Sequence, residues 1–282
     1  MKPAAPRLPS VIVPVYNAAA DVGACLASVA ATVPHGSEVL IIDDASPDPA
    51  VRRLLGAWAE RKLSGWRFLH NLENRGFVGT ANCGMRATAG DVVLLNSDTL
   101  VAPGWLQGLQ RCLESDPAIA TATPWTNNGE IASLPAFCQK NPVPPDLDAV
   151  AAAVRAAGPP TYPELPTAVG FCMAISRRAI ERVGVFDEDL FGRGYGEEND
   201  FSMRAVAAGM RNVLCDDAYV AHRGGRSFGP LGLEPDGSSM RRLLSRHPDY
   251  LARVEAFIRD DPLAVRRSAV TAALDRAAVA LR

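Results

Sequence analysis

The stretch Asp91–Asp98 constrains the fold of this chain most strongly. It contains four consecutive apolar residues, followed at once by Asn96, Ser97 and Asp98. An unbroken apolar run of this length is typical of a strand buried on both faces in the middle of a parallel sheet. Ligands of open α/β sheets bind beyond the carboxyl ends of the strands, so we expect this polar tip to face the functional site. Asp98 can hold a hard divalent cation there, or it can simply cap a turn or helix.

Apolar runs and helical segments alternate along the first 123 residues. Strands are predicted over residues 10–16, 38–44, 66–70, 91–98 and 118–123, and helices over 18–33, 80–89 and 103–115, with another helix after the turn at 45–49. Right-handed βαβ crossovers then give a mostly parallel sheet flanked by helices. The pattern therefore predicts an α/β domain, and this architecture alone leaves the function open.

The rest of the chain differs in character. Residues 124–166 are rich in proline and contain one alanine-rich helical stretch, so we expect an excursion over the sheet. Further strands are predicted over 168–175, 210–214 and 218–222, and short helices from 177 and from 197. The tail from Ser238 predicts two arginine-rich amphipathic helices separated near Asp261-Pro262. They would form a packing or oligomer arm, or a patch that contacts an anionic membrane.

The composition argues against several classes of protein. With 48% hydrophobic and 21% charged residues among 282, the chain has the composition of a soluble globular protein. A net charge of −2 gives no reason to expect a nucleic-acid partner. No apolar run approaches the roughly 20 residues of a membrane span, and residues 1–9 do not resemble a signal peptide. The six scattered cysteines are expected to be free thiols, which indicates a cytoplasmic protein.

The tips of the first two strands carry further candidates. Pro14-Val-Tyr-Asn17 stands where a dinucleotide-binding fold would place Gly-x-Gly-x-x-Gly, which argues against a nicotinamide-dependent dehydrogenase. The second strand ends in Asp43 and Asp44. A carboxylate there can accept hydrogen bonds from a nucleobase or ribose, or it can cap the following helix.

A glycine-rich loop over residues 192–196 leads into an acidic helix start. The helix macrodipole favours acidic residues in a first turn, and Asp200 can pair with Arg204 four residues later. This structural explanation accounts for Asp200, but it does not account for the two further carboxylates of Glu197 and Glu198.

Seven motifs occur in a characteristic order. They are Val13-Pro-Val-Tyr-Asn17, Ile41-Ile-Asp-Asp-Ala-Ser46, Asn74-Arg-Gly-Phe77 with Ala81-Asn82, Leu95-Asn-Ser-Asp98, Gly170-Phe-Cys-Met-Ala-Ile175, Gly194-Tyr-Gly-Glu-Glu-Asn-Asp-Phe201 and Tyr219-Val-Ala-His222. Each is weak alone, but together they make residues 9–229 resemble the inverting family 2 nucleotide-sugar glycosyltransferases with a GT-A fold. The particular likeness is to bacterial rhamnosyl- and galactosyltransferase-like members that build cell-surface polysaccharides.

The resemblance implies a role for each matched position. It implies a nucleoside or donor contact for Pro14, Tyr16, Asp44, Gly76, Asn82 and Asn96, metal binding for Asp98 and His222, and the catalytic base for Glu198, with Asp43, Glu197 and Asp200 as second choices. It also implies a GT-A domain over 1–230, with a donor half at about 9–123 and an acceptor and catalytic half at about 124–230, and a C-terminal helical extension over 231–282.

One position departs from the family pattern. Asn96 stands where the metal motif of the family has its first aspartate. An amide can hydrogen-bond a ribose hydroxyl but brings no charge. Asp98 is then the only carboxylate of this motif at the metal, so we expect Mg²⁺ or Mn²⁺ to be bound mainly through the donor diphosphate.

The resemblance therefore implies transfer of a sugar from a nucleotide-diphosphate donor to a saccharide or lipid-linked saccharide. An inverting displacement needs one base and a cation that neutralises the leaving diphosphate. Two alternatives stay open: a sugar nucleotidyltransferase, which should carry a glycine- and lysine- or arginine-rich loop that residues 17–20 lack, and a catalytically inactive binding module. Peripheral contact with the inner face of the membrane and homo-oligomer formation are further expectations.

Overall fold

The computed structural model describes residues 7–224 and 237–280, except for the side chains of 277–280. Its strands are β1 (Ser10–Val15), β2 (Val39–Asp43), β3 (Trp66–His70), β4 (Val92–Leu95), β5 (Thr99–Val101), β6 (Ile119–Trp125), β7 (Glu164–Leu165), β8 (Cys172–Ile175) and β9 (Arg211–His222). Its helices are α1 (Ala19–Thr32), α2 (Pro49–Glu60), α3 (Gly76–Arg86), α4 (Trp105–Ser115), the 3-10 turn η1 (Glu130–Ala132), α5 (Leu147–Ala156), α6 (Arg177–Val183), α7 (Glu188–Phe191), α8 (Glu197–Ala207), α9 (Ser238–Arg246), α10 (Tyr250–Asp260) and α11 (Ala264–Ala280).

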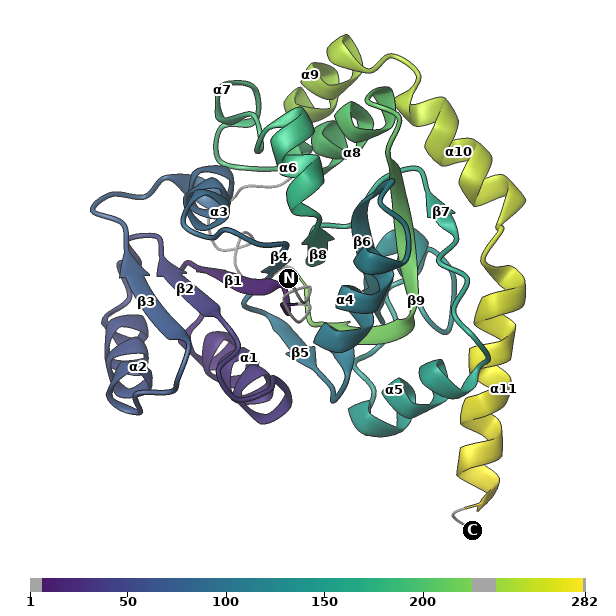
Figure 1. Cartoon of the computed structure of the whole chain (residues 1–282), viewed down its shortest axis with the longest axis horizontal. Coiled ribbons are helices and arrows are strands. Elements are labelled where there is room, and N and C mark those ends of the chain that lie inside the picture. Colours follow the sequence, from purple (N-terminus) through teal and green to yellow (C-terminus); the bar gives the residue numbers. More distant parts are fainter. Residues whose placement is uncertain (1–6, 225–236, 281–282) are drawn as a thin grey trace, which may run out of the picture.

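The strands of the described residues form one sheet in the order β3-β2-β1-β4-β8-β6-β9-β5, with β7 paired to β9. β3, β2, β1 and β4 run parallel to one another. β8 lies antiparallel between β4 and β6, and β6 is again parallel to β9. Helices flank the sheet, as Figure 1 shows. The predicted α/β class, with a central sheet between helices and a helical C-terminus, is confirmed.

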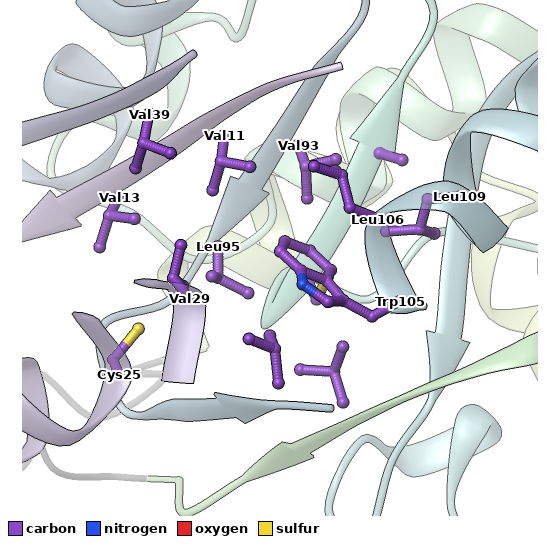
Figure 2. Close-up of a cluster of buried hydrophobic side chains, with 14 of the residues drawn as sticks. Val11, Val13, Cys25, Val29, Val39, Val93, Leu95, Trp105, Leu106 and Leu109 are labelled. Carbon is purple, nitrogen blue, oxygen red and sulfur yellow. The ribbon is translucent and has the colours of Figure 1, made fainter. Parts of the chain in front are cut away.

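The central strands are buried on both faces because alternate side chains enter different core layers. Val11 and Val13 of β1 pack with α1 and α4, where Trp105 is 1% exposed (Figure 2). Ile12 lies in the opposite layer with side chains of α3 and α8. All four residues of β4 are buried, as the apolar run 92–95 predicts.

One long strand, β9, replaces the two short strands predicted over 210–214 and 218–222. The acidic residues Asp216 and Asp217 lie between the two predicted strands. In the structure each of them has a basic partner at 2.7 Å, Arg266 and Arg111 respectively. Because paired carboxylates can be buried, the strand continues through them to His222.

The C-terminal tail contains three helices rather than two. The predicted break near Asp261 is present, and a second break lies at Pro248, whose ring cannot continue a helix interior. Figure 1 shows α10 and α11, in yellow, along one edge of the molecule. Leu243 and Tyr250 are buried in the layer that contains α8, and Val270 is buried in a third cluster with α5.

The expected domain boundary between residues 230 and 231 lies outside the described residues. Among the helices of the described ranges, none is long and apolar enough to cross a membrane.

Candidate active site

A cavity of about 360 Å³ collects residues from both halves of the sheet. The expected site residues that line it are Pro14, Tyr16, Asp44, Gly76, Asn96, Asp98, Glu197, Glu198 and His222. They come from widely separated parts of the sequence. The cavity is therefore a product of the sheet topology and not of one local motif.

The parallel strands bring the first group together. The register pairs Val15 of β1 with Asp43 of β2, and Ile12 of β1 with Leu94 of β4. The carboxyl ends of these strands therefore meet at one edge of the sheet, and the residues that follow them line the cavity.

The antiparallel strands bring the second group to the same edge. Asn96, after β4, donates its backbone N–H to the carbonyl of Phe171 at 2.9 Å, just before β8. His222, at the end of β9, is paired in register with Thr99 of β5. This pairing places His222 beside the tip of β4 although 124 residues separate it from Asp98.

Asp98 and His222 form a buried acid–imidazole pair. Oδ1 of Asp98 lies 3.4 Å from Nε2 of His222 and has no hydrogen-bond partner among the described residues. Nδ1 of His222 lies 2.8 Å from the carbonyl oxygen of Asn128, which can only accept, so Nδ1 carries a proton and Nε2 faces Asp98. Burial lowers the pKa of His222, but the Asp98 carboxylate and the Asn128 carbonyl together leave the pKa raised.

The side chain of Asn127, next to Asn128 in the sequence, fixes the backbone of His222. Asn127 accepts the His222 N–H at 2.8 Å and donates to the His222 carbonyl at 3.0 Å. The ring and the backbone of His222 are thus both held by neighbouring residues of one loop. Such outer contacts are what orient a metal-ligating histidine.

The Asp98–His222 pair fits a divalent cation. A buried carboxylate oxygen without a hydrogen-bond donor faces an imidazole nitrogen, and both atom types are ligands of Mn²⁺ and related ions. Within residues 7–224 and 237–280, no group of three or more His, Cys, Asp or Glu side chains could hold a metal ion. A cation at this pair would need ligands besides these two side chains.

The acidic pair opens α8 directly after a tightly turned loop. Tyr195 and Gly196 have φ angles of +71° and +98°, so the chain turns sharply into the helix. The carboxylate of Glu198 accepts the Gly196 N–H at 3.3 Å. Glu197 is 5% exposed, and its Oε2 has no hydrogen-bond partner among the described residues.

Both carboxyl groups of the pair have raised pKa values. Burial raises the pKa of Glu198, and the backbone N–H groups of the helix start partly offset this. Burial, together with the charge of Glu198, raises the pKa of Glu197 well above its ordinary value. Burial therefore shifts both carboxyl groups of the pair toward the protonated form.

Asp44 does not cap the following helix, because Asp48 does so through the Ala50 N–H at 2.8 Å. Asp44 instead accepts from the Asn71 side chain and from the Arg75 N–H, both at 2.8 Å. Both bonds that the described residues make to this carboxylate use Oδ1. Oδ2 remains for a donor group in the cavity.

Three expected site residues lie outside the cavity lining. Asn82 is fully buried and exchanges hydrogen bonds of 2.9 and 3.0 Å with the backbone of Phe186. Asp43 contacts Nδ1 of His70 at 3.0 Å. Asp200 is fully buried. These side chains contact other parts of the protein, and none of them lines this cavity.

The cavity also contains residues that the sequence did not single out. Asn74, Phe171 and Tyr195 stand inside the seven motifs, so those motifs held the signal for them. Glu130 and Arg193 belong to the proline-rich excursion and the glycine-rich loop, where no residue stood out.

Gly76 shows how closely that loop approaches α3. A Cβ at residue 76 would lie 2.7 Å from the Cα of Arg193, and the φ of Gly76 is +71°. Phe77 donates its backbone N–H to the Arg193 carbonyl at 3.1 Å. Glycine is therefore required at 76 for the loop to pass over the start of α3.

Residues 10–184 match the model of glycosyl transferase family 2. The chain belongs to this family. The match ends before the acidic pair and His222, so it covers the tips of β1, β2 and β4 but not the whole cavity. No curated protein matches the chain.

Solved structures of glycosyltransferases share the fold of this chain. GalNAc-T7 with UDP, GalNAc and Mn²⁺ has a TM-score of 0.63 at 16% identity, over 88% of this chain and 52% of its own. The mannosyltransferase PcManGT from Pyrobaculum calidifontis with GDP-Man and Mn²⁺ has a TM-score of 0.62 at 20% sequence identity. The similarity covers 99% of this chain and 78% of the mannosyltransferase chain. S. aureus TarS 1-349 with UDP-GlcNAc has a TM-score of 0.59 at 19% sequence identity. The similarity covers 90% of this chain and 74% of the TarS chain. This family 2 member thus spans about half of GalNAc-T7, and its GT-A-type fold is confirmed.

Proposed function

We propose that this family 2 member is an inverting glycosyltransferase that moves a hexosyl group from a nucleotide-diphosphate sugar to a hydroxyl of a saccharide or lipid-linked saccharide. The observation that carries the proposal is the shared cavity of Asp98, His222 and Glu198, next to the strand-tip residues Tyr16 and Asp44. Family membership supports the reaction class. The structural neighbours with UDP, GDP-Man and UDP-GlcNAc support the class of donor.

The charge of the cavity supports metal dependence. The carboxylates among its described lining residues are Asp44, Asp98, Glu130, Glu197 and Glu198. The basic side chains there are Arg193 and His222. A diphosphate would meet net negative charge in this cavity, so its binding requires added positive charge. A divalent cation held by Asp98 and His222 would supply that charge to the leaving diphosphate.

Glu198 is the general base of the proposed reaction. It takes the proton of the acceptor hydroxyl while the hydroxyl oxygen forms a bond to the anomeric carbon. The bond from that carbon to the diphosphate breaks in the same step, and the proton ends on Glu198. A single displacement of this kind inverts the anomeric configuration. The raised pKa of Glu198 brings its basicity nearer to neutral pH, which favours proton transfer.

A donor-turnover assay separates this function from the two alternatives. UDP-, dTDP- and GDP-sugars are incubated with the protein and Mn²⁺, and release of the nucleoside diphosphate is measured with and without EDTA. We expect release from one donor class, abolished by EDTA. Donor binding without release would favour an inactive binding module. Pyrophosphate release from a nucleoside triphosphate and a sugar phosphate would favour a nucleotidyltransferase.

The acceptor and the cellular site complete the proposal. The resemblance to enzymes of cell-surface polysaccharide synthesis suggests an acceptor on the cytoplasmic side, with peripheral contact at the inner face of the membrane. A transfer assay with wild-type protein and membrane extracts of its source, analysed for a lipid-linked product, tests this. Transfer only to soluble saccharides would contradict the lipid-linked acceptor.

A further inference from the structure

Two of the three carboxylates in the first turn of α8 face different surroundings. Glu198 lines the cavity, whereas Asp200, two residues later, is fully buried. Residues two apart on an α-helix point about 200° away from each other. The base and Asp200 therefore lie on opposite faces of the same helical turn.

Asp200 is held by three basic side chains. Nε of Arg204 lies 2.7 Å from Oδ2, while Nη1 of Arg246 at 3.1 Å and Nε2 of His247 at 2.9 Å contact Oδ1. A buried carboxylate is costly unless it is paired and hydrogen-bonded, so these contacts determine where this turn can lie.

Two of the three partners come from the C-terminal extension. Arg246 ends α9 and His247 follows it, 46 and 47 residues after Asp200 in sequence. Arg246 also donates to Asp187 at 2.8 Å, the residue that caps α7. The extension thus contacts both α8 and the segment that leads to the glycine-rich loop before it.

Apolar contacts support the same arrangement. Leu243 of α9 is fully buried and Tyr250 of α10 is 7% exposed. Both belong to the core layer that contains Phe201 and Met203 of α8. The extension is consequently packed against the helix that carries the acidic pair.

We propose that Arg246 and His247 are positioning residues for the base: by holding Asp200 they fix the first turn of α8 and, through it, the place of Glu198 in the cavity. This inference rests on the proposed function, because it concerns the residue that we assign as base. The expected loss is in the chemical step, since a displacement of about 1 Å in a reacting group can reduce a rate by about 100-fold. Donor binding depends on other residues and should be preserved.

The test compares variants of the 282-residue chain. Arg246→Ala and His247→Leu remove the contacts, whereas Arg246→Lys and His247→Gln keep a donor at similar reach. Arg259→Ala is the matched control, because Arg259 is an exposed arginine of α10 whose ionic partner among the described residues is its neighbour Asp260. For each protein, kcat and donor KM are measured with the UDP-, dTDP- or GDP-sugar that the wild type hydrolyses, together with hydrogen exchange of amides 197–207.

We expect Arg246→Ala and His247→Leu to lower kcat by about 10- to 100-fold with donor KM within about twofold, and to speed exchange in residues 197–207. The conservative variants should recover most of kcat, and Arg259→Ala should match the wild type. Unchanged kcat, or a donor KM that rises as much as kcat falls, would overturn the inference. If the wild type turns over no donor, the proposed function fails, and the exchange rates of 197–207 alone then decide whether the extension holds α8: unchanged exchange overturns the inference.

Discussion

The proposed donor side and the proposed base side of the cavity are built in different ways. The donor side consists of residues that directly follow β1, β2 and β4, and these strands are neighbours in a parallel register. The base side consists of α8, the end of β9 and the loop at 127–130, which meet only through long-range contacts. The comparison teaches that one half of this site follows from local sequence, whereas the other depends on how distant segments pack.

The two sides should fail in different ways when they are altered. Changes on the donor side should appear as weaker donor binding. Changes on the base side should appear as slower turnover of a donor that still binds.

Substitution of the base should have the largest effect. Glu198→Gln keeps the size of the side chain but removes the proton acceptor, so kcat for transfer should fall by about 10²–10⁴-fold. The donor dissociation constant, measured by calorimetry in Mn²⁺, should stay within about twofold because donor contacts lie on the other side. Glu197→Gln is the matched control and should retain most of kcat. A nearly active Glu198→Gln beside an inactive Glu197→Gln would move the base to Glu197.

Substitution at the tip of β2 should affect binding instead. Asp44→Asn retains an oxygen for the Asn71 and Arg75 donors but removes the charge that we expect to contact the nucleobase. Loss of a charge-assisted hydrogen bond should weaken donor binding by about 1.5–3 kcal/mol, with kcat at saturating donor nearly unchanged. Asp44→Ala should in addition lower the melting temperature, because the loop at 71–75 loses its acceptor. Wild-type donor affinity in Asp44→Asn would contradict a donor contact by this carboxylate.

The smallest effect on function is expected at Asn82. Its side chain connects α3 to the backbone of Phe186 and to the Glu188 carboxylate, the latter at 2.8 Å. Asn82→Ala should lower the free energy of unfolding by about 1–3 kcal/mol, measured by urea denaturation, because buried backbone groups lose their partners. Donor affinity of the folded protein should be unchanged. If Asn82→Ala binds the donor much more weakly and unfolds with the free energy of the wild type, Asn82 has the donor-binding role that the resemblance implies.

The same contrast explains how far the sequence could predict this protein. An apolar run that ends in polar residues identifies a buried strand and its tip, and parallel strands place their tips together, so the cavity positions of Tyr16, Asp44 and Asp98 could be foreseen. The position of His222 beside Asp98 requires the register of β5 with β9, which no local pattern contains.

Other features depended on tertiary contacts that the sequence does not reveal. Asn82 belongs to a family motif, but its burial against residue 186 depends on a segment about 100 residues later. Asp200 was expected to pair with Arg204, and that pair is present at 2.7 Å. Its further contacts with Arg246 and His247 depend on how the C-terminal helices pack, which helical periodicity does not determine.

The two sides of the cavity meet at Asp98 and His222, one from each side. The central claim is that this pair binds a cation together with the donor diphosphate. The most direct measurement is a calorimetric Mn²⁺ titration of the wild type and of Asp98→Asn, each without nucleotide and with saturating UDP or GDP. Wild-type protein should bind Mn²⁺ at least about tenfold more tightly with the nucleotide, because the diphosphate supplies the missing ligands, and Asp98→Asn should lose most of this gain. Equal Mn²⁺ affinity with and without either nucleotide would contradict the account.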